Sequence, residues 1–255
     1  MNKDEDVDVE QVILRSDNDC KRAGNLYKKL NLFESVVISL EVKGFKTRNF
    51  IKAPKYKKVA PEWFPECLDF VESDTTSEFI DTLPGFRNRR RLTAAPEKMI
   101  GDVLAGFTLA DYGNAVAEAL KTNKTSWVLL NLAAFYHRMN GDAYFGLECA
   151  KRAFHYSPKE HKDIALISMA SLLYRGNHAE DALTIARATP NICGDNSMAP
   201  AVYTLTGLIL ASISDFDAAV DAFSAAIKHT KQPEVLHSYR YAIKCHAKVQ
   251  IRHAL

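Results

Sequence analysis

The sequence lacks the short motifs that mark most enzyme classes. Its glycine-containing stretch Gly101–Gly106 is not followed by the Lys-Ser/Thr pair of a phosphate-binding loop. It contains no G-x-S-x-G or H-E-x-x-H motif, and its eight histidines never pair at the spacing of metal ligands. Scattered carboxylates between residues 62 and 81 have solvation as their default role. We therefore expect a protein that is not an enzyme, with no cofactor and no metal.

The chain also lacks a strong excess of charge of one sign. Its 33 basic and 31 acidic residues leave a formal net charge of +2 at pH 7, so there is no global attraction to nucleic acid or to an anionic membrane. The N-terminus is acidic without an apolar segment, so it is not a secretory signal as it stands. No charged residue lies between Asp195 and Asp215, and Asn196 and Pro200 favour a buried helix there over a membrane span.

Cysteine is scarce, and its spacing is uninformative. The five cysteines are odd in number, far apart and free of C-x-x-C pairs: Cys20, Cys67, Cys149, Cys193 and Cys245. This pattern suggests neither a disulfide framework nor a zinc site. The triplet Asn123-Lys124-Thr125 fits an N-glycosylation acceptor, which matters only in a secreted chain. We favour a polar turn between helices at this position.

Residues 1–95 differ from the rest of the chain in their hydrophobic pattern and in the distribution of their charges. Segment 9–33 is compatible with a helix, and residues 36–42 are a β-prone run that ends at Gly44. Seven basic residues follow without an acid: Lys43, Lys46, Arg48, Lys52, Lys55, Lys57 and Lys58. Residues 59–86 then hold seven acids and no base. A solvated connector is favoured over an anionic-surface contact, because the neighbouring acids cancel much of the field.

From residue 96 onward, alanine- and leucine-rich helices alternate with short polar breaks, with self-similarity at about 34 residues. In the clearest unit, Tyr203 and Gly207 lie one turn apart on a first helix, and Ala219, Phe223 and Ala226 form a stripe on the second. Small residues are needed where two antiparallel helices cross closely, and large ones where they fill the gap between repeats. This is the tetratricopeptide pattern.

Other units follow the same pattern. Residues 132–158 and 166–186 form two of them, and a fainter one has Met99–Leu109 and Tyr112–Leu120 as its helices. A polar helix from Pro233 to about Ile251 is suited to cap the stack. The sequence therefore predicts an all-α, tetratricopeptide-type α-solenoid of three to four hairpins plus a capping helix over residues 96–255. Residues 1–95 are expected to be mixed or partly disordered.

Four stretches resemble the repeat region of the tetratricopeptide repeat protein 17 family. They are Thr125–Leu129, Ala153–Pro158, Lys162–Ser168 and Ile243–His246, within a resemblance that covers about residues 115–250. The resemblance implies a non-enzymatic protein associated with actin filament polymerisation and with the building of cilia. It also implies a cytoplasmic, cytoskeleton-associated location, near the plasma membrane.

In a solenoid of this kind, the first helix of each hairpin lines the concave face. The register places nine candidate partner-binding residues there: Trp127, Leu130, Asn131, His137, Arg138, Ile167, Tyr174, Arg175 and Leu208. Arg138 and Arg175 are candidates for holding a carboxylate, and Trp127 and Tyr174 for anchoring an apolar residue. Both arginines also lie near helix ends, where they complement the dipole. We expect a scaffold that binds other proteins and no nucleic acid, with a membrane-surface or polyanion-binding adaptor acting through residues 43–58 as the alternative.

Overall fold

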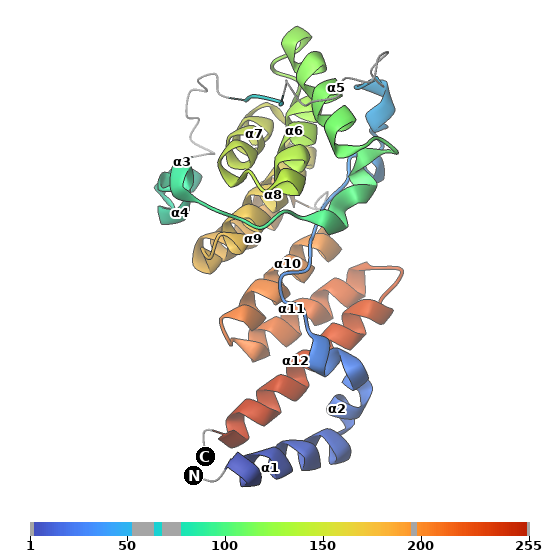
Figure 1. Cartoon of the computed structure of the whole chain (residues 1–255), viewed down its shortest axis with the longest axis vertical. Helices are drawn as coiled ribbons and strands as arrows, with labels where there is room; N and C mark the ends of the chain where they lie inside the picture. Colours follow the sequence, from blue (N-terminus) through green and yellow to red (C-terminus); the bar gives the residue numbers. More distant parts are fainter. Residues whose placement is uncertain (1–2, 53–63, 68–77, 195–197, 254–255) are drawn as a thin grey trace. The chain divides into compact units, whose positions relative to one another are not determined.

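The computed structural model describes residues 3–52, 64–67, 78–194 and 198–253 (Figure 1). These residues form helices and connecting segments with no β-strand among them, which confirms the all-α class. They divide into two compact units. The first unit comprises residues 1–34 together with 199–255, and the second comprises residues 35–198. The boundary expected near residue 95 therefore falls within the second unit.

The second unit is built on two helical hairpins. Helix α6 (Trp127–Asn140) pairs with α7 (Ala143–Tyr156), and α8 (Lys162–Arg175) pairs with α9 (Ala179–Cys193). Packing of α7 against α8 joins the two hairpins. At the start of α6 the Ser126 side chain accepts a hydrogen bond from the N–H of Leu129, and Gly141 ends the helix with φ 86°. The predicted hairpin register over residues 127–193 is confirmed.

Of the two helices predicted for the fainter unit before these hairpins, only the second is present as an α-helix. Helix α5 (Leu109–Thr122) packs on α6, as the second helix of a hairpin would pack. The expected first helix over residues 99–109 is instead the short 3-10 helix η5 (Lys98–Leu104). It ends because Ala105 and Gly106 both adopt positive φ, 52° and 88°. This unit is therefore an incomplete hairpin.

Shorter elements connect the larger ones in the second unit: η2 (Glu41–Lys43), η3 (Thr47–Asn49), α3 (Glu78–Thr82), α4 (Pro84–Arg87), η4 (Arg89–Arg91) and η6 (Lys159–His161). They lie in the region expected to be mixed or partly disordered, apart from η6. Of the predicted charge blocks, residues 53–63 and 68–77 lie outside the described residues.

The first unit contains the hairpin with the clearest sequence markers. Helix α10 (Ala199–Ser212) pairs with α11 (Phe216–His229). A Cβ added to Gly207 would lie 2.6 Å from the Phe223 ring, so only glycine fits this helix crossing. The uncharged stretch read from the sequence forms α10, and no helix among the described residues is long and apolar enough to cross a membrane.

Helix α12 (Glu234–His253) packs on α11 and is covered on another face by the N-terminal helices, as Figure 1 shows. These are α1 (Lys3–Ser16), α2 (Asn18–Ala23) and the 3-10 helix η1 (Gly24–Lys29). The helix expected over residues 9–33 is thus broken. The break occurs at Asp17, whose carboxylate accepts the N–H groups of Asp19 and Cys20 and so begins α2. The capping helix is therefore itself covered.

Four of the five cysteines form two disulfide bonds, so the expectation of no disulfide framework is wrong. Cys20 joins Cys245 across 225 residues, and Cys67 joins Cys149 across 82. The fifth, Cys193, is buried and free. Spacing rules miss such bonds because they read short-range patterns, whereas here the fold brings α2 onto α12 and residues 64–67 onto α7.

Candidate partner-binding groove

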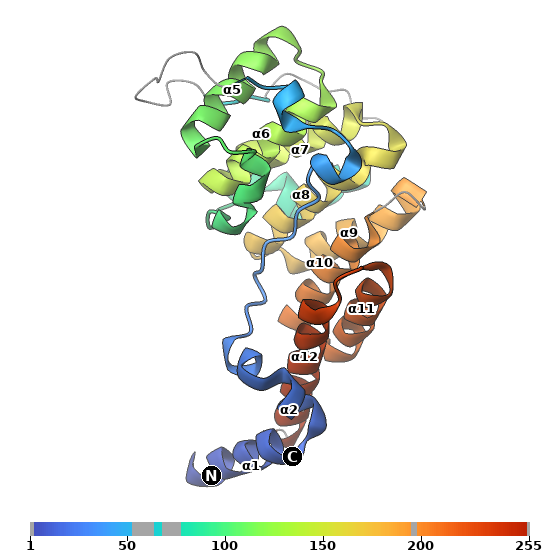
Figure 2. The same cartoon turned by 90° about the vertical axis from the view of Figure 1, so that its right-hand side faces the viewer.

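The predicted concave side of α6 and α8 is covered by a segment of the same chain. Residues 35–45, here called the strap, cross this side, with an extended backbone through residues 35–39 (Figure 2). The Val36 carbonyl accepts hydrogen bonds from Arg138 Nη2 at 2.8 Å and from Ser171 Oγ at 3.4 Å. One donor comes from each hairpin's first helix, so the strap lies on both.

The strap explains the β-prone pattern read from the sequence. Val36, Ile38 and Leu40 are buried, whereas Val37 and Ser39 between them are partly exposed. An extended segment with one face against a helical surface shows the same period of two as a strand. The Val36 carbonyl bonds to side chains of α6 and α8, and the described residues of the strap form no strand.

All three guanidinium nitrogens of Arg138 donate hydrogen bonds to groups of the same chain. Its Nε and Nη2 donate to the two carboxylate oxygens of Glu97, each at 2.8 Å, and its Nη1 donates to Ser168 Oγ at 3.3 Å. Arg138 is 1% exposed and Glu97 is 2% exposed. Arg138 was predicted to hold a carboxylate of a partner, and in the structure it holds the carboxylate of Glu97 in the same chain. A buried pair of this kind needs both partners, because removing one leaves an uncompensated charge.

Two opposing effects act on the Glu97 carboxyl. Burial by itself would raise its pKa, but the charge and hydrogen bonds of Arg138 outweigh burial and hold the pKa below the ordinary value. The Glu97 N–H also donates to the Arg138 carbonyl at 3.0 Å, which fixes the backbone of residues 96–98 to the end of α6. Glu97 is therefore ionised at neutral pH and holds Arg138 in place.

A second charged contact fixes the far end of the strap. Lys43 Nζ lies 2.8 Å from Asp163 Oδ2 and also donates to the Glu160 carbonyl at 3.2 Å. The side chains of Lys43 and Asp163 are almost fully buried. Next to this pair, the Phe45 ring meets the Trp127 ring edge-on with centroids 4.9 Å apart. The position predicted to anchor an apolar residue therefore already has an apolar ring against it.

The other predicted groove residues also have contacts within the chain. His137 Nε2 is 2.7 Å from the Pro65 carbonyl, and burial lowers the pKa of this histidine. Asn131 donates to the Trp127 carbonyl at 2.9 Å, and Arg175 donates to the Ala95 carbonyl at 3.4 Å. The buried members of the set are Leu130, Asn131, His137, Arg138, Ile167, Tyr174 and Leu208. Leu208 belongs to α10 in the first unit.

Sequence reasoning missed the residues that complete the site. Glu97 and Val36 contact Arg138 from 41 and 102 residues away, and no local pattern indicates such a distance. The available signal was the alternation of residues 36–40, which indicates an extended segment with one buried face. It did not indicate which surface that face would meet.

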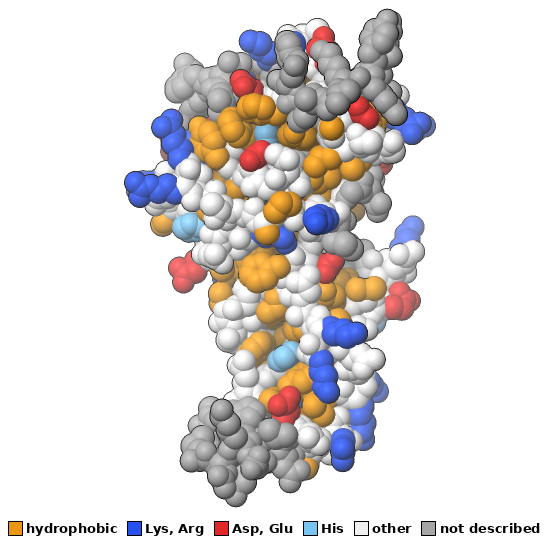
Figure 3. Space-filling view, viewed as in Figure 1, with side chains coloured by type: hydrophobic (Ala, Val, Ile, Leu, Met, Phe, Trp, Pro, Cys, Tyr) orange, Lys and Arg blue, Asp and Glu red, His pale blue; other side chains and the backbone are white. Residues whose placement is uncertain are grey.

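The predicted anionic-surface residues do not behave alike. Lys43 is paired with Asp163, whereas Lys46, Arg48 and Lys52 are exposed, with Arg48 donating to the Ala105 carbonyl at 3.0 Å. Lys55, Lys57 and Lys58 lie outside the described residues. In the first unit, Figure 3 shows basic side chains gathered where α2 and η1 lie; Lys21, Arg22, Lys28 and Lys29 are the exposed bases of these elements.

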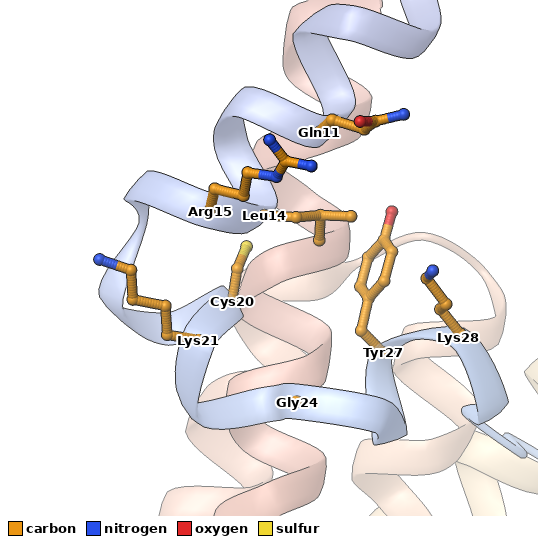
Figure 4. A pocket seen from close by; sticks show the side chains of 8 residues that line it. All are labelled: Gln11, Leu14, Arg15, Cys20, Lys21, Gly24, Tyr27 and Lys28. Atoms are coloured by element: carbon orange, nitrogen blue, oxygen red, sulfur yellow. The ribbon is translucent and has the colours of Figure 1, made fainter.

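A cavity of about 560 Å³ lies between α1 and η1 of the first unit. Figure 4 shows Leu14 and Tyr27 directed into it, while Lys21 points away. The Tyr27 hydroxyl donates to Glu10 at 2.9 Å, and burial with this contact raises its pKa to about 12. The phenol thus stays protonated at neutral pH. Within the described parts of the chain, no three His, Cys, Asp or Glu side chains gather to hold a metal ion.

Comparison with known proteins shows one set of similar sequences. The chain is 31% identical to tetratricopeptide repeat protein 17 of Mus musculus over 98% of its own length, and 30% identical to the Homo sapiens protein over 98%. It spans only about a fifth of the length of these curated relatives (21% and 22%). No family model matches the chain. No solved structure matches it either.

The similarity covers more than the resemblance over residues 115–250, because it includes the N-terminal helices and the strap. The paired helices and the close crossing at Gly207 agree with this similarity. The chain is therefore a tetratricopeptide-type repeat protein that is similar, along almost its full length, to one segment of tetratricopeptide repeat protein 17.

Proposed function

We propose that this chain is a non-enzymatic scaffold that binds extended segments of other proteins on the concave side of its hairpins. The observation that carries the proposal is the strap. A peptide segment lies across α6 and α8, with its backbone carbonyl at Val36 accepting from Arg138 and Ser171 and its alternate side chains buried. Backbone recognition combined with pockets for alternate side chains is a recurring way of binding an extended peptide.

In this proposal the strap competes with partner segments for the same place on α6 and α8. It is held in the same chain as the groove, so its effective concentration there is high, in the millimolar range for a short linker. A partner segment then needs similar apolar side chains at alternate positions and must displace the strap. Binding is expected to be weak until the strap is loosened.

We expect a labelled peptide of residues 35–45 to bind the full chain carrying Val36→Ser and Ile38→Ser. These changes remove two buried apolar side chains from the strap and so free its place on α6 and α8. The native chain should bind the peptide about ten-fold or more weakly, because its own strap competes. Fluorescence anisotropy of the labelled peptide measures both affinities.

A peptide with serine in place of Val36 and Ile38 serves as the control and should bind neither chain. Circular dichroism checks that the substituted chain keeps its helices. Absence of saturable binding to a folded substituted chain would contradict the groove proposal, and equal binding of both peptides would show that the contact is not specific.

The resemblance adds a finer proposal, a role in actin filament polymerisation and cilium organisation at the cytoskeleton. It rests on the similarity to tetratricopeptide repeat protein 17 and not on the groove. We expect the purified chain to co-sediment with actin filaments only when a bridging partner from a cell extract is added. The reason is that the strap already covers the proposed binding side of α6 and α8. A pellet free of the chain under both conditions would argue against this role.

The alternative of a membrane-surface or polyanion-binding adaptor is favoured by the exposure of Lys46, Arg48 and Lys52. Three positive charges contribute about 1 kcal/mol each near an anionic surface, and salt screens them. Flotation with vesicles that contain or lack phosphatidylserine, at low salt, separates this alternative from the scaffold.

A further inference from the structure

We propose that Asn123 carries an N-linked glycan and that the chain folds in the oxidising secretory compartment where such glycans are added. The proposal goes beyond the scaffold function and does not depend on it. Two independent observations support it. One is the pair of disulfide bonds, and the other is the geometry of the turn that contains Asn123.

The disulfide bonds are integral to the two units. Cys20 and Cys245 belong to the buried cluster that joins α2 and η1 to α12, together with Ala23, Tyr27 and Val249. Cys67 and Cys149 fix residues 64–67 to α7, next to the contact between Pro65 and His137. Structural disulfides form and persist in secretory compartments, whereas the thiols of cytosolic proteins are kept reduced.

The fifth cysteine fits the same setting. Cys193 is 2% exposed at the end of α9. Burial, followed in importance by the nearby Asp163 charge, raises the pKa of its thiol to about 12. Because the thiolate is the reactive form, burial and the raised pKa of Cys193 disfavour its exchange with the two disulfides. All five cysteines are within the described residues, and none presents a thiol to solvent.

The acceptor triplet lies in the turn between α5, which ends at Thr122, and α6, which begins at Trp127. Residues 121–125 are all exposed. Asn123 has φ −141° and ψ 78°, outside the helical region, and its carbonyl accepts the N–H of Ser126 at 3.4 Å. Its backbone is thus fixed while its side chain faces solvent. A bulky glycan at this position displaces no core residue, and the sequence contains no other N-x-Ser/Thr triplet.

The modification transfers a preassembled oligosaccharide from a lipid-linked diphosphate donor to the side chain. A bond forms between Asn123 Nδ2 and C1 of the first sugar, and the bond between C1 and the diphosphate oxygen breaks. The diphosphate leaves with the bonding electron pair, and the amide nitrogen loses one proton to a base of the transferase. The hydroxyl of Thr125 completes the recognition triplet.

The test uses the natural protein, expressed from its own gene in cultured eukaryotic cells. Peptide-N-glycosidase F should increase its mobility on a denaturing gel and convert Asn123 to aspartate, which peptide mass spectrometry detects. Thr125→Ala should abolish the shift, because it removes the hydroxyl that the triplet needs. Thr125→Ser keeps the hydroxyl and should keep the shift, and it is a matched control because it alters the same exposed side chain. Asn88→Gln, at an exposed asparagine outside any triplet, should change nothing.

Alkylation in denaturant, without reductant, of protein taken from acid-quenched cells tests the compartment separately. After acid quenching and denaturation, which expose every buried thiol, Cys20, Cys67, Cys149 and Cys245 should still resist maleimide until the protein is reduced, whereas Cys193 should react at once. Unmodified Asn123 in the mature protein would overturn the glycan, and labelling of these four cysteines without reduction would overturn the compartment. If both parts hold, the chain does not contact cytoplasmic actin directly, and the proposed role in actin polymerisation requires a membrane-spanning partner.

Discussion

Replacing Arg138 with methionine should lower the free energy of unfolding by about 3–5 kcal/mol, because the substitution leaves the Glu97 carboxylate buried without its partner. Methionine keeps most of the side-chain volume, so the loss reports the charge and not a cavity. It should also release the strap, since the Val36 carbonyl loses its 2.8 Å donor. Urea unfolding at pH 7, followed by circular dichroism, measures the change.

The double substitution Arg138→Met with Glu97→Met is the decisive comparison. Removing both charges should recover most of the lost stability, because apolar replacement of a buried ion pair is often neutral or stabilising. Arg187→Met, at an exposed arginine of α9, should change the unfolding free energy by less than about 0.5 kcal/mol. A double variant as unstable as Arg138→Met alone would show that the ion pair is not the cause.

The same pair sets a pH dependence. Because the folded-state pKa of Glu97 lies below the unfolded value, its contribution to stability is fully present above about pH 4.5 and is lost as the pH falls through the folded pKa. The native chain should therefore lose stability more steeply in acid than the double methionine variant does.

Removing the Cys20–Cys245 disulfide by substituting both residues with alanine should cost about 5 kcal/mol, the chain-entropy estimate for a loop that spans 225 residues. The loss should concentrate in the first unit, since this bond joins α2 to α12 in that unit. Hydrogen exchange should show faster exchange of α12 amides, with α6 and α7 little changed.

Cys193→Ala is the matched control, because it removes a buried sulfur that forms no disulfide. It should cost only the small cavity of a deleted side-chain atom, about 1 kcal/mol. Equal exchange of α12 amides in the disulfide variant and this control would show that the bond adds little to the stability of the first unit.

The repeat register could be predicted because its causes are local. Gly207 and Phe223 meet across one hairpin, and their spacing is fixed by two helices and a short turn. The same holds for Ser126 and Gly141 at the ends of α6. Helix pairing, capping and close crossing each depend on residues within about one repeat, so a single sequence contains the whole pattern.

The filling of the groove could not be predicted, because its causes are distant in sequence. The predicted groove residues belong to α6, α8 and α10, but nothing in the sequence near Arg138 indicates that Glu97 and Val36 contact it. In the sequence, Lys43 is one member of a run of basic residues. In the structure it is buried in an ion pair with Asp163, which is 120 residues away (163 minus 43). The two disulfides could not be predicted for the same reason, because their cysteines are 225 and 82 residues apart.

The first unit is discontinuous, since residues 35–198 are inserted between its two parts. During synthesis, α1 and α2 leave the ribosome long before α12 exists. At about 5–20 residues per second, the 225 residues between Cys20 and Cys245 take about 10–45 s to make. Throughout that interval the second unit can complete its hairpins, while Cys20 remains without its partner. The early helices α1 and α2 therefore stay without the helix that covers them until α12 has been made.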